Sequence, residues 1–114
     1  MGTHFLVKNI KEPIDWTVEV PGSKSMTNRA LLLAALSDGT VELSGVLFSD
    51  DSRHFLSCLT ALGFAVECDE EKKCAAVCGC GGKIPKKQAV INVGSAGTAA
   101  RFLTALLGFS DGVY

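Results

Sequence analysis

Residues 21–29, with the sequence PGSKSMTNR, combine residue types that suit the binding of a small anion. The Pro-Gly pair ends a strand-like segment, and the serines on either side of Lys24 suit the N-cap of the helix predicted over Lys24–Leu36. A helix N-terminus carries unpaired N–H groups and about half a positive charge. Lys24 and Arg29 add positive charge there, and Arg29 shares a helical face with Ser25. The segment therefore predicts a phosphate or carboxylate site, although a capped helix with two solvated cations has the same pattern.

Residues 94–107, with the sequence GSAGTAARFLTALL, repeat this design after another strand-like segment. The Gly-Ser pair recurs 72 positions later, and Arg101 follows Arg29 at the same interval. Gly97 lies in the first turn of the predicted helix, where a glycine costs up to about 1 kcal/mol relative to alanine. We therefore expect a duplicated strand–turn–helix unit, in which a ligand or a close neighbour occupies the space beside Gly97.

Composition limits the partners of the chain. The 114 residues carry a net charge of −1, so no basic excess indicates nucleic-acid binding. The longest apolar stretch, residues 30–36, is too short to span a membrane, and the N-terminus lacks a secretory pattern. We expect a cytoplasmic domain, or a piece of a larger one.

The five cysteines fit such a location as thiols rather than as disulfides. Cys74, Cys78 and Cys80 share strand parity, which predicts one buried face of a strand. A metal site is the alternative, but the spacing lacks the usual pairs of cysteines separated by two residues.

Hydrophobic periodicity predicts a mixed chain, α/β or α+β, with helices packed on one sheet. We expect helices at 24–36, at about 51–62 and after residue 94. The segments with strand-like patterns are 5–7, 16–20, 40–43, 64–68, 74–78 and 89–93. Residues 111–114 look like the start of another strand, so we expect one complete unit, part of the next, and a truncated chain.

These motifs resemble those of the 5-enolpyruvylshikimate-3-phosphate synthase family. The resemblance rests on residues 21–36, on the Ser-Asp-Asp run at 49–51, on residues 59–63 and on the Gly-x-Ala-Gly-Thr-Ala-x-Arg pattern at 94–101. It covers nearly the whole chain, in family order and spacing. Residues 1–114 would then be the N-terminal fragment, about the first quarter, of an enolpyruvyl transferase whose fold is built from βαβαββ repeats.

The resemblance implies a reaction. The enolpyruvyl group of phosphoenolpyruvate moves to the 5-hydroxyl of shikimate 3-phosphate, in chorismate and aromatic amino acid biosynthesis. The implied partners are these two small molecules and the missing C-terminal remainder of the enzyme; no metal or organic cofactor is implied. The family's acid and base carboxylates lie in that later portion, so we expect no catalytic residue and no turnover in this chain alone.

The resemblance also assigns binding roles by matching position. Lys24 would contact both substrates, and Ser25 and Arg29 would hold shikimate 3-phosphate. Gly97 would belong to the phosphoenolpyruvate pocket, supported by two further residues of the same helix start, Thr98 and Arg101.

Asp51 would be a polar group near the cleft, although its place in the sequence favours a helix N-cap. Thr98 could likewise be only a helix-start hydroxyl, and we interpret His54 as a surface histidine.

The chain departs from the family pattern at Ser95, where asparagine is common, and at Phe102, where a smaller residue is common. Because Gly97 keeps the small residue of glyphosate-sensitive members, the resemblance implies a sensitive enzyme.

The sequence leaves three alternatives. A related transferase that acts on UDP-N-acetylglucosamine would have the same fold, but it lacks the motif of residues 23–29. A nucleotide-binding P-loop is disfavoured because no glycine directly precedes Lys24. The third is a catalytically inactive module that only binds anions.

Overall fold

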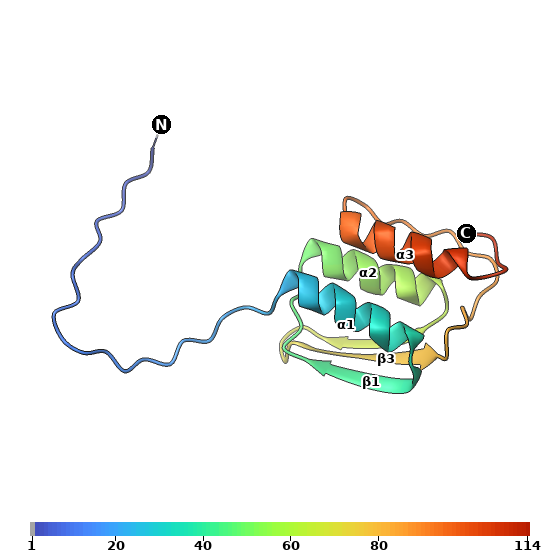
Figure 1. The fold of residues 1–114 in the computed structure, drawn as a ribbon, viewed down its shortest axis with the longest axis horizontal. Coiled ribbons are helices and arrows are strands. Elements are labelled where there is room, and N and C mark those ends of the chain that lie inside the picture. Colours follow the sequence, from blue (N-terminus) through green and yellow to red (C-terminus); the bar gives the residue numbers. More distant parts are fainter. Residues whose placement is uncertain (1) are drawn as a thin grey trace.

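The computed structural model describes residues 2–114 and contains three helices and one three-stranded sheet (Figure 1). Residues 2–23 form an extended segment without helix or strand that runs away from the folded part of the chain. None of the helices in the described part of the chain is long and apolar enough to cross a membrane.

The sheet contains β1 (Asp38–Ser44), β2 (Ala65–Asp69) and β3 (Cys74–Cys80). Their spatial order is β1-β3-β2, and both outer strands run antiparallel to β3. Val77 at the centre of β3 lies opposite Val41 and Val66. The strands predicted at 40–43, 64–68 and 74–78 are confirmed, and the last two pair as an antiparallel hairpin.

The helices are α1 (Lys24–Leu36), α2 (Asp50–Ala61) and α3 (Gly97–Gly108). The Ser23 hydroxyl caps α1 by accepting a hydrogen bond from the Met26 amide, at 3.3 Å. A reciprocal pair of side chain–backbone bonds between Ser49 and Ser52 begins α2. Gly63 follows α2 with a φ of 95°, a conformation that favours glycine at a helix end. The three predicted helices are therefore confirmed.

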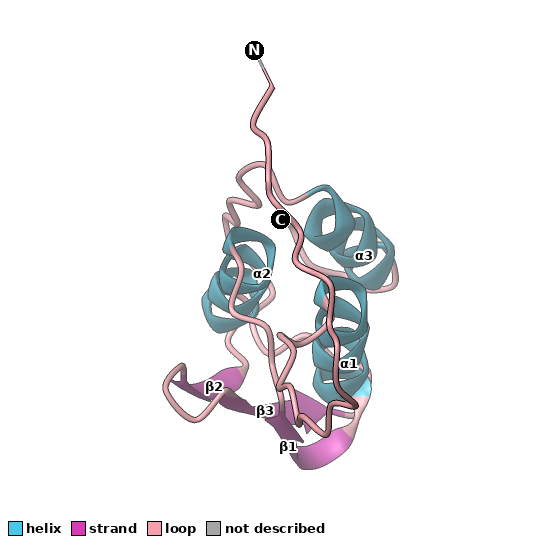
Figure 2. Ribbon diagram, turned by 90° about the vertical axis from the view of Figure 1, so that its left-hand side faces the viewer, coloured by secondary structure: helices cyan, strands magenta, loops and turns pink. Residues whose placement is uncertain are grey.

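The elements form three layers. Figure 2 shows α1 and α2 over one face of the sheet and α3 on the other side of these two helices. In agreement with this view, α3 packs against α1 and α2 but has no contact with the strands. All three helices run in the same direction, so their N-termini lie at one end of the molecule (Figure 1).

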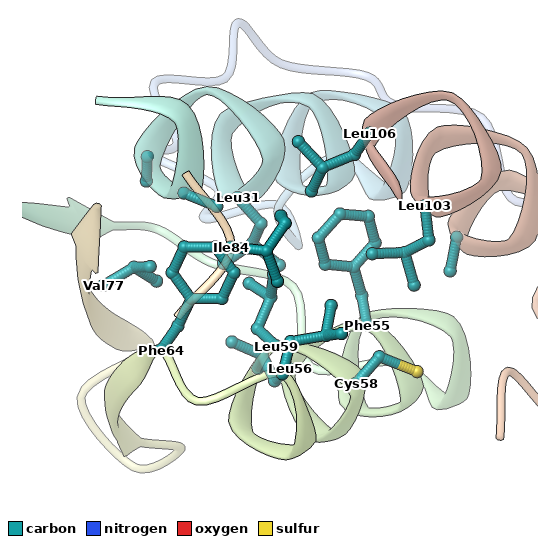
Figure 3. Packing of buried hydrophobic residues seen from close by; sticks show 14 of the residues in the cluster. Leu31, Phe55, Leu56, Cys58, Leu59, Phe64, Val77, Ile84, Leu103 and Leu106 are labelled. Atoms are coloured by element: carbon teal, nitrogen blue, oxygen red, sulfur yellow. The ribbon is translucent and has the colours of Figure 1, made fainter. Parts of the chain in front are cut away.

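A single hydrophobic core lies between these layers (Figure 3). Phe55 and Leu59 of α2 are fully buried among Leu31 of α1, Val77 of β3 and Leu103 of α3. Complete burial of one such side chain stabilises the folded state by about 1.5–3 kcal/mol. The core therefore ties each helix, and with it each helix N-terminus, to the sheet.

The cysteines of β3 lie on the opposite face from the one we predicted. Along β3, Ala75, Val77 and Gly79 are buried beneath the helices, whereas Cys74 and Cys78 are half-exposed on the outer face. Cys80, at the end of the strand, is also half-exposed but packs against the edge of the core. The prediction that the three cysteines share one side of the strand is confirmed, but the prediction that this side is buried is wrong. The other side faces α1, which approaches the sheet too closely for a larger residue at Gly79. All five cysteines are free, and residues 2–114 gather no group of three or more His, Cys, Asp or Glu side chains that could hold a metal ion.

Three predicted strands are absent from the part of the chain that the structure describes. Residues 5–7, 16–20 and 89–93 are not assigned to strands, so the observed order is α-β-α-β-β-α. Near the last of them, Gln88 and Val113 form only an isolated parallel bridge. Alternating apolar residues make a strand only where a neighbouring strand accepts their backbone hydrogen bonds. In this structure Trp16, Val18 and Val20 lie in the exposed segment instead.

Candidate functional site

The N-terminal turns of α1 and α3 carry most of the predicted binding residues. Neither helix has an acidic residue in its own first turn that would offset the positive end of its dipole. Lys24, Ser25 and Arg29 of α1 and Gly97 of α3 are exposed to solvent. An approaching anion would therefore meet backbone N–H groups and cationic side chains together.

Lys24 lies next to a carboxylate of the second helix. Its Nζ is 2.6 Å from Oδ2 of Asp51, whose side chain is 17% exposed, whereas the Lys24 side chain is 54% exposed. One of the two predictions for Asp51, that it is the N-cap of α2, is wrong, because Ser49 occupies that position. The ion pair directs the Lys24 side chain toward α2 and leaves about half of that side chain exposed.

The two predicted arginines differ in their partners. Arg29 donates from Nη1 to the backbone carbonyl of Ser25, at 3.2 Å, which holds the guanidinium along the first turn of α1. Arg101 is exposed on α3 and takes part in no ion pair with residues 2–114. Both guanidinium groups are therefore at the surface, one turn or so into their helices.

The start of α3 has no side-chain cap. Its N-cap residue is Ala96, which makes no capping hydrogen bond, so the first N–H groups of α3 lack the acceptor that Ser23 supplies to α1. A Cβ built on Gly97 would meet no atom within 4 Å. The packing of the rest of the protein therefore does not require a glycine there. Thr98 in the same turn is half-buried.

Helix α2 brings the two turns together. It supplies Asp51 to Lys24, and one turn further along it supplies His54 to the α3 turn. A Cβ on Gly94 would lie 2.5 Å from both Cε1 and Nε2 of the His54 ring, so the turn before α3 packs directly on this side chain. His54 is half-buried and not fully exposed at the surface. In the sequence, the only sign that His54 and Asp51 lie on the same face of a helix is their spacing of three residues.

A neighbouring arginine is already neutralised. Arg53 of α2 donates from Nε and Nη2 to the two carboxylate oxygens of Glu70, at 3.0 and 3.1 Å. These hydrogen bonds lower the pKa of Glu70 and raise the pKa of Arg53. The pair lines an open cavity of about 460 Å³ beside Gly22 and Leu47, which contains none of the predicted binding residues.

Asn28 is the residue in this region that sequence reasoning left without a role. It is 0% exposed, and neither Oδ1 nor Nδ2 has a hydrogen-bond partner in the structure. Leaving a buried polar group without a partner costs about 1–3 kcal/mol. Asn28 lies one turn after Lys24 on the same face of α1.

Comparison with known proteins identifies the family of this chain. The family model described as EPSP synthase (3-phosphoshikimate 1-carboxyvinyltransferase) matches residues 8–114. The chain belongs to the EPSP synthase family. It is 50% identical to the 3-phosphoshikimate 1-carboxyvinyltransferase of Trichormus variabilis over 105 residues, which are 92% of this chain and 25% of that protein. The corresponding protein of Yersinia pestis is 50% identical over 95 residues, covering 82% of this chain and 22% of the relative.

A solved structure confirms the fold. The EPSP synthase from Acinetobacter baumannii matches with a TM-score of 0.72 and 27% sequence identity, over 79% of this chain and 20% of the other. The fold is therefore that of the enolpyruvyl transferases, and the resemblance described above is confirmed. This EPSP synthase family chain spans about a quarter of the length of the curated relatives that it matches.

Proposed function

We propose that this chain forms part of the substrate site of a 3-phosphoshikimate 1-carboxyvinyltransferase. The reaction would move the enolpyruvyl group of phosphoenolpyruvate to the 5-hydroxyl of shikimate 3-phosphate and release phosphate. One observation carries the proposal within this family: two cationic or uncapped helix N-termini, α1 and α3, are anchored on one helix through Lys24–Asp51 and Gly94–His54. Such an end of the fold suits two small, multiply charged anions.

The proposed roles follow from what each group offers. Lys24, held by Asp51 but exposed, would contact both substrates, while Ser25 and Arg29 would bind shikimate 3-phosphate. On α3, the open space beside Gly97 would admit phosphoenolpyruvate.

Thr98 and Arg101 would support that second pocket. Binding both reactants at neighbouring helix ends would orient them and stabilise charge in the transition state. We further propose a cytoplasmic location, in line with the five free thiols.

A second candidate function applies to the isolated chain. Because the chain spans about a quarter of its relatives, we propose that alone it binds anions without turnover. Proton transfer in this reaction needs positioned acid and base groups, each worth typically 10²–10⁴-fold in rate. Turnover by the isolated chain, measured as phosphate release, would contradict this proposal.

The test is a titration of the chain with shikimate 3-phosphate, followed through backbone amide shifts by NMR. We expect shifts at residues 23–29 and 94–101, because these turns hold the proposed ligands. Lys24→Met keeps the aliphatic stem but removes the charge, and it should weaken binding at least tenfold.

Lys83→Met, at an exposed loop position, is the matched control and should bind as the wild type does. Equal affinity of the wild type and Lys24→Met would contradict the role of Lys24. No response at millimolar ligand in a folded sample would mean that this chain alone does not form the site.

Gly97→Ala separates a ligand role from a packing role. Since the added methyl group meets no atom within 4 Å, we expect an unchanged fold and a gain in stability of less than about 1 kcal/mol. Binding of phosphoenolpyruvate should nevertheless weaken several-fold, because the methyl group would enter the proposed pocket.

Denaturant unfolding and a phosphoenolpyruvate titration of the same sample measure both effects. A stable variant with unchanged affinity would remove Gly97 from the proposed pocket.

A further inference from the structure

The first turn of α3 has backbone N–H groups without a side-chain acceptor, and the buried side chain of Asn28 has an acceptor without a donor. The first turn of α3 offers N–H donors and has no capping side chain. The Asn28 carboxamide offers an acceptor, Oδ1, that is buried and unbonded. Almost all buried polar side-chain atoms in native proteins have a partner, so each exception calls for a physical explanation.

The packing of the helices places Asn28 and the first turn of α3 at similar positions along the two helix axes. Leu32 and Leu36 of α1 line a small apolar cavity together with Phe102 and Leu106 of α3. The two helices run parallel, and α3 begins further along their common direction than α1 does (Figure 1). One turn before Leu32, α1 carries Asn28, which is therefore level with the beginning of α3.

The direction of the side chain brings the groups closer still. Helical side chains lean toward the helix N-terminus, which carries the amide of Asn28 toward the level of Ala96 and Gly97. The inward face of α3 has only small residues here, Ala96 and Ala99, both buried.

We propose that Asn28 is a positioning residue that couples the two anion-binding turns. When a ligand draws the turns of α1 and α3 together, Oδ1 of Asn28 accepts a hydrogen bond from the first turn of α3. The unsatisfied amide thus gains a partner only in the bound state, which adds to ligand affinity. This inference rests on the proposed function of the same site.

Unfolding experiments test the first half of the proposal, with a buried and bonded side chain for comparison. Ser52 is also 0% exposed, but it donates to the Leu47 carbonyl at 2.6 Å and accepts from the Ser49 amide at 2.8 Å. Ser52→Ala should therefore lower the denaturant midpoint. Asn28→Leu should leave the midpoint unchanged or raise it, because it removes an amide that has no partner.

A loss of stability in Asn28→Leu as large as that in Ser52→Ala would overturn the proposal, since the amide would already be bonded. Asn28→Ala adds no volume and keeps the test valid if leucine does not fit.

Ligand binding tests the second half. With shikimate 3-phosphate as the probe, both Asn28 variants should bind about tenfold more weakly than the wild type. They should also lose the ligand-induced amide shifts at residues 97–99 while keeping those at residues 23–29.

Wild-type affinity and wild-type shifts in both variants would overturn the Asn28 inference alone. A wild-type chain that shows no shifts at either turn would instead contradict binding by this chain and the coupling together.

Discussion

Gly79→Ala is expected to destabilise the fold by about 3 kcal/mol, near the upper end of the usual cost of overpacking. Gly79 lies in the central strand, directly beneath the C-terminal end of α1. An added Cβ would overlap the carbonyl oxygens of Ala34 and Ser37 and the Ser37 hydroxyl. Because two of these atoms belong to the backbone, α1 would have to move away from the sheet.

Equilibrium unfolding in urea measures this effect. Gly108→Ala is the matched control, because a Cβ at the end of α3 meets no atom within 4 Å. It should change stability by less than about 1 kcal/mol. Equal unfolding midpoints for the two variants would show that α1 does not sit on β3 as the structure has it.

Phe55→Ala is expected to cost about 3–5 kcal/mol, the usual range for truncation of a fully buried phenylalanine. The ring of Phe55 is 0% exposed and extends from α2 toward Leu103 and Leu106 of α3 (Figure 3). A small domain is stable by only about 5–15 kcal/mol, so this single change removes a large share. It should also loosen α3, which has no contact with the sheet.

Phe109→Ala removes the same ring from a position that is 93% exposed and should be nearly neutral. Urea unfolding of both variants makes the comparison. Hydrogen exchange of the α3 amides should speed up in Phe55→Ala and not in Phe109→Ala. Similar losses of stability would contradict the position of Phe55 at the centre of the core.

Local features of this chain were predictable from its residues. The run of Ala and Leu after Ser23 predicts α1, and the structure confirms both the helix and its cap. Gly63 predicts the end of α2, and the charged turn between β2 and β3 predicts a hairpin. In each of these cases, the propensities and hydrogen bonds that determine the element lie within a few residues of one another.

Features that depend on a distant partner were not predictable in this way. Residues 16–20 and 89–93 have strand-like patterns but pair with no strand in the described chain. The alternation along β3 establishes which residues share a face, but it does not say which face is buried. That choice depends on α1, whose close approach at Gly79 demands the face with small residues.

The candidate site divides in the same way. The residues alone were enough to predict the two helix starts that follow Gly-Ser pairs, the cations beside them and the family to which these motifs belong. Only the tertiary structure decided that Asp51 pairs with Lys24, that His54 packs on Gly94 and that Asn28 is buried without a partner. The physical reason is that these contacts join side chains on separate helices, and their geometry exists only once the shared core has fixed those helices side by side.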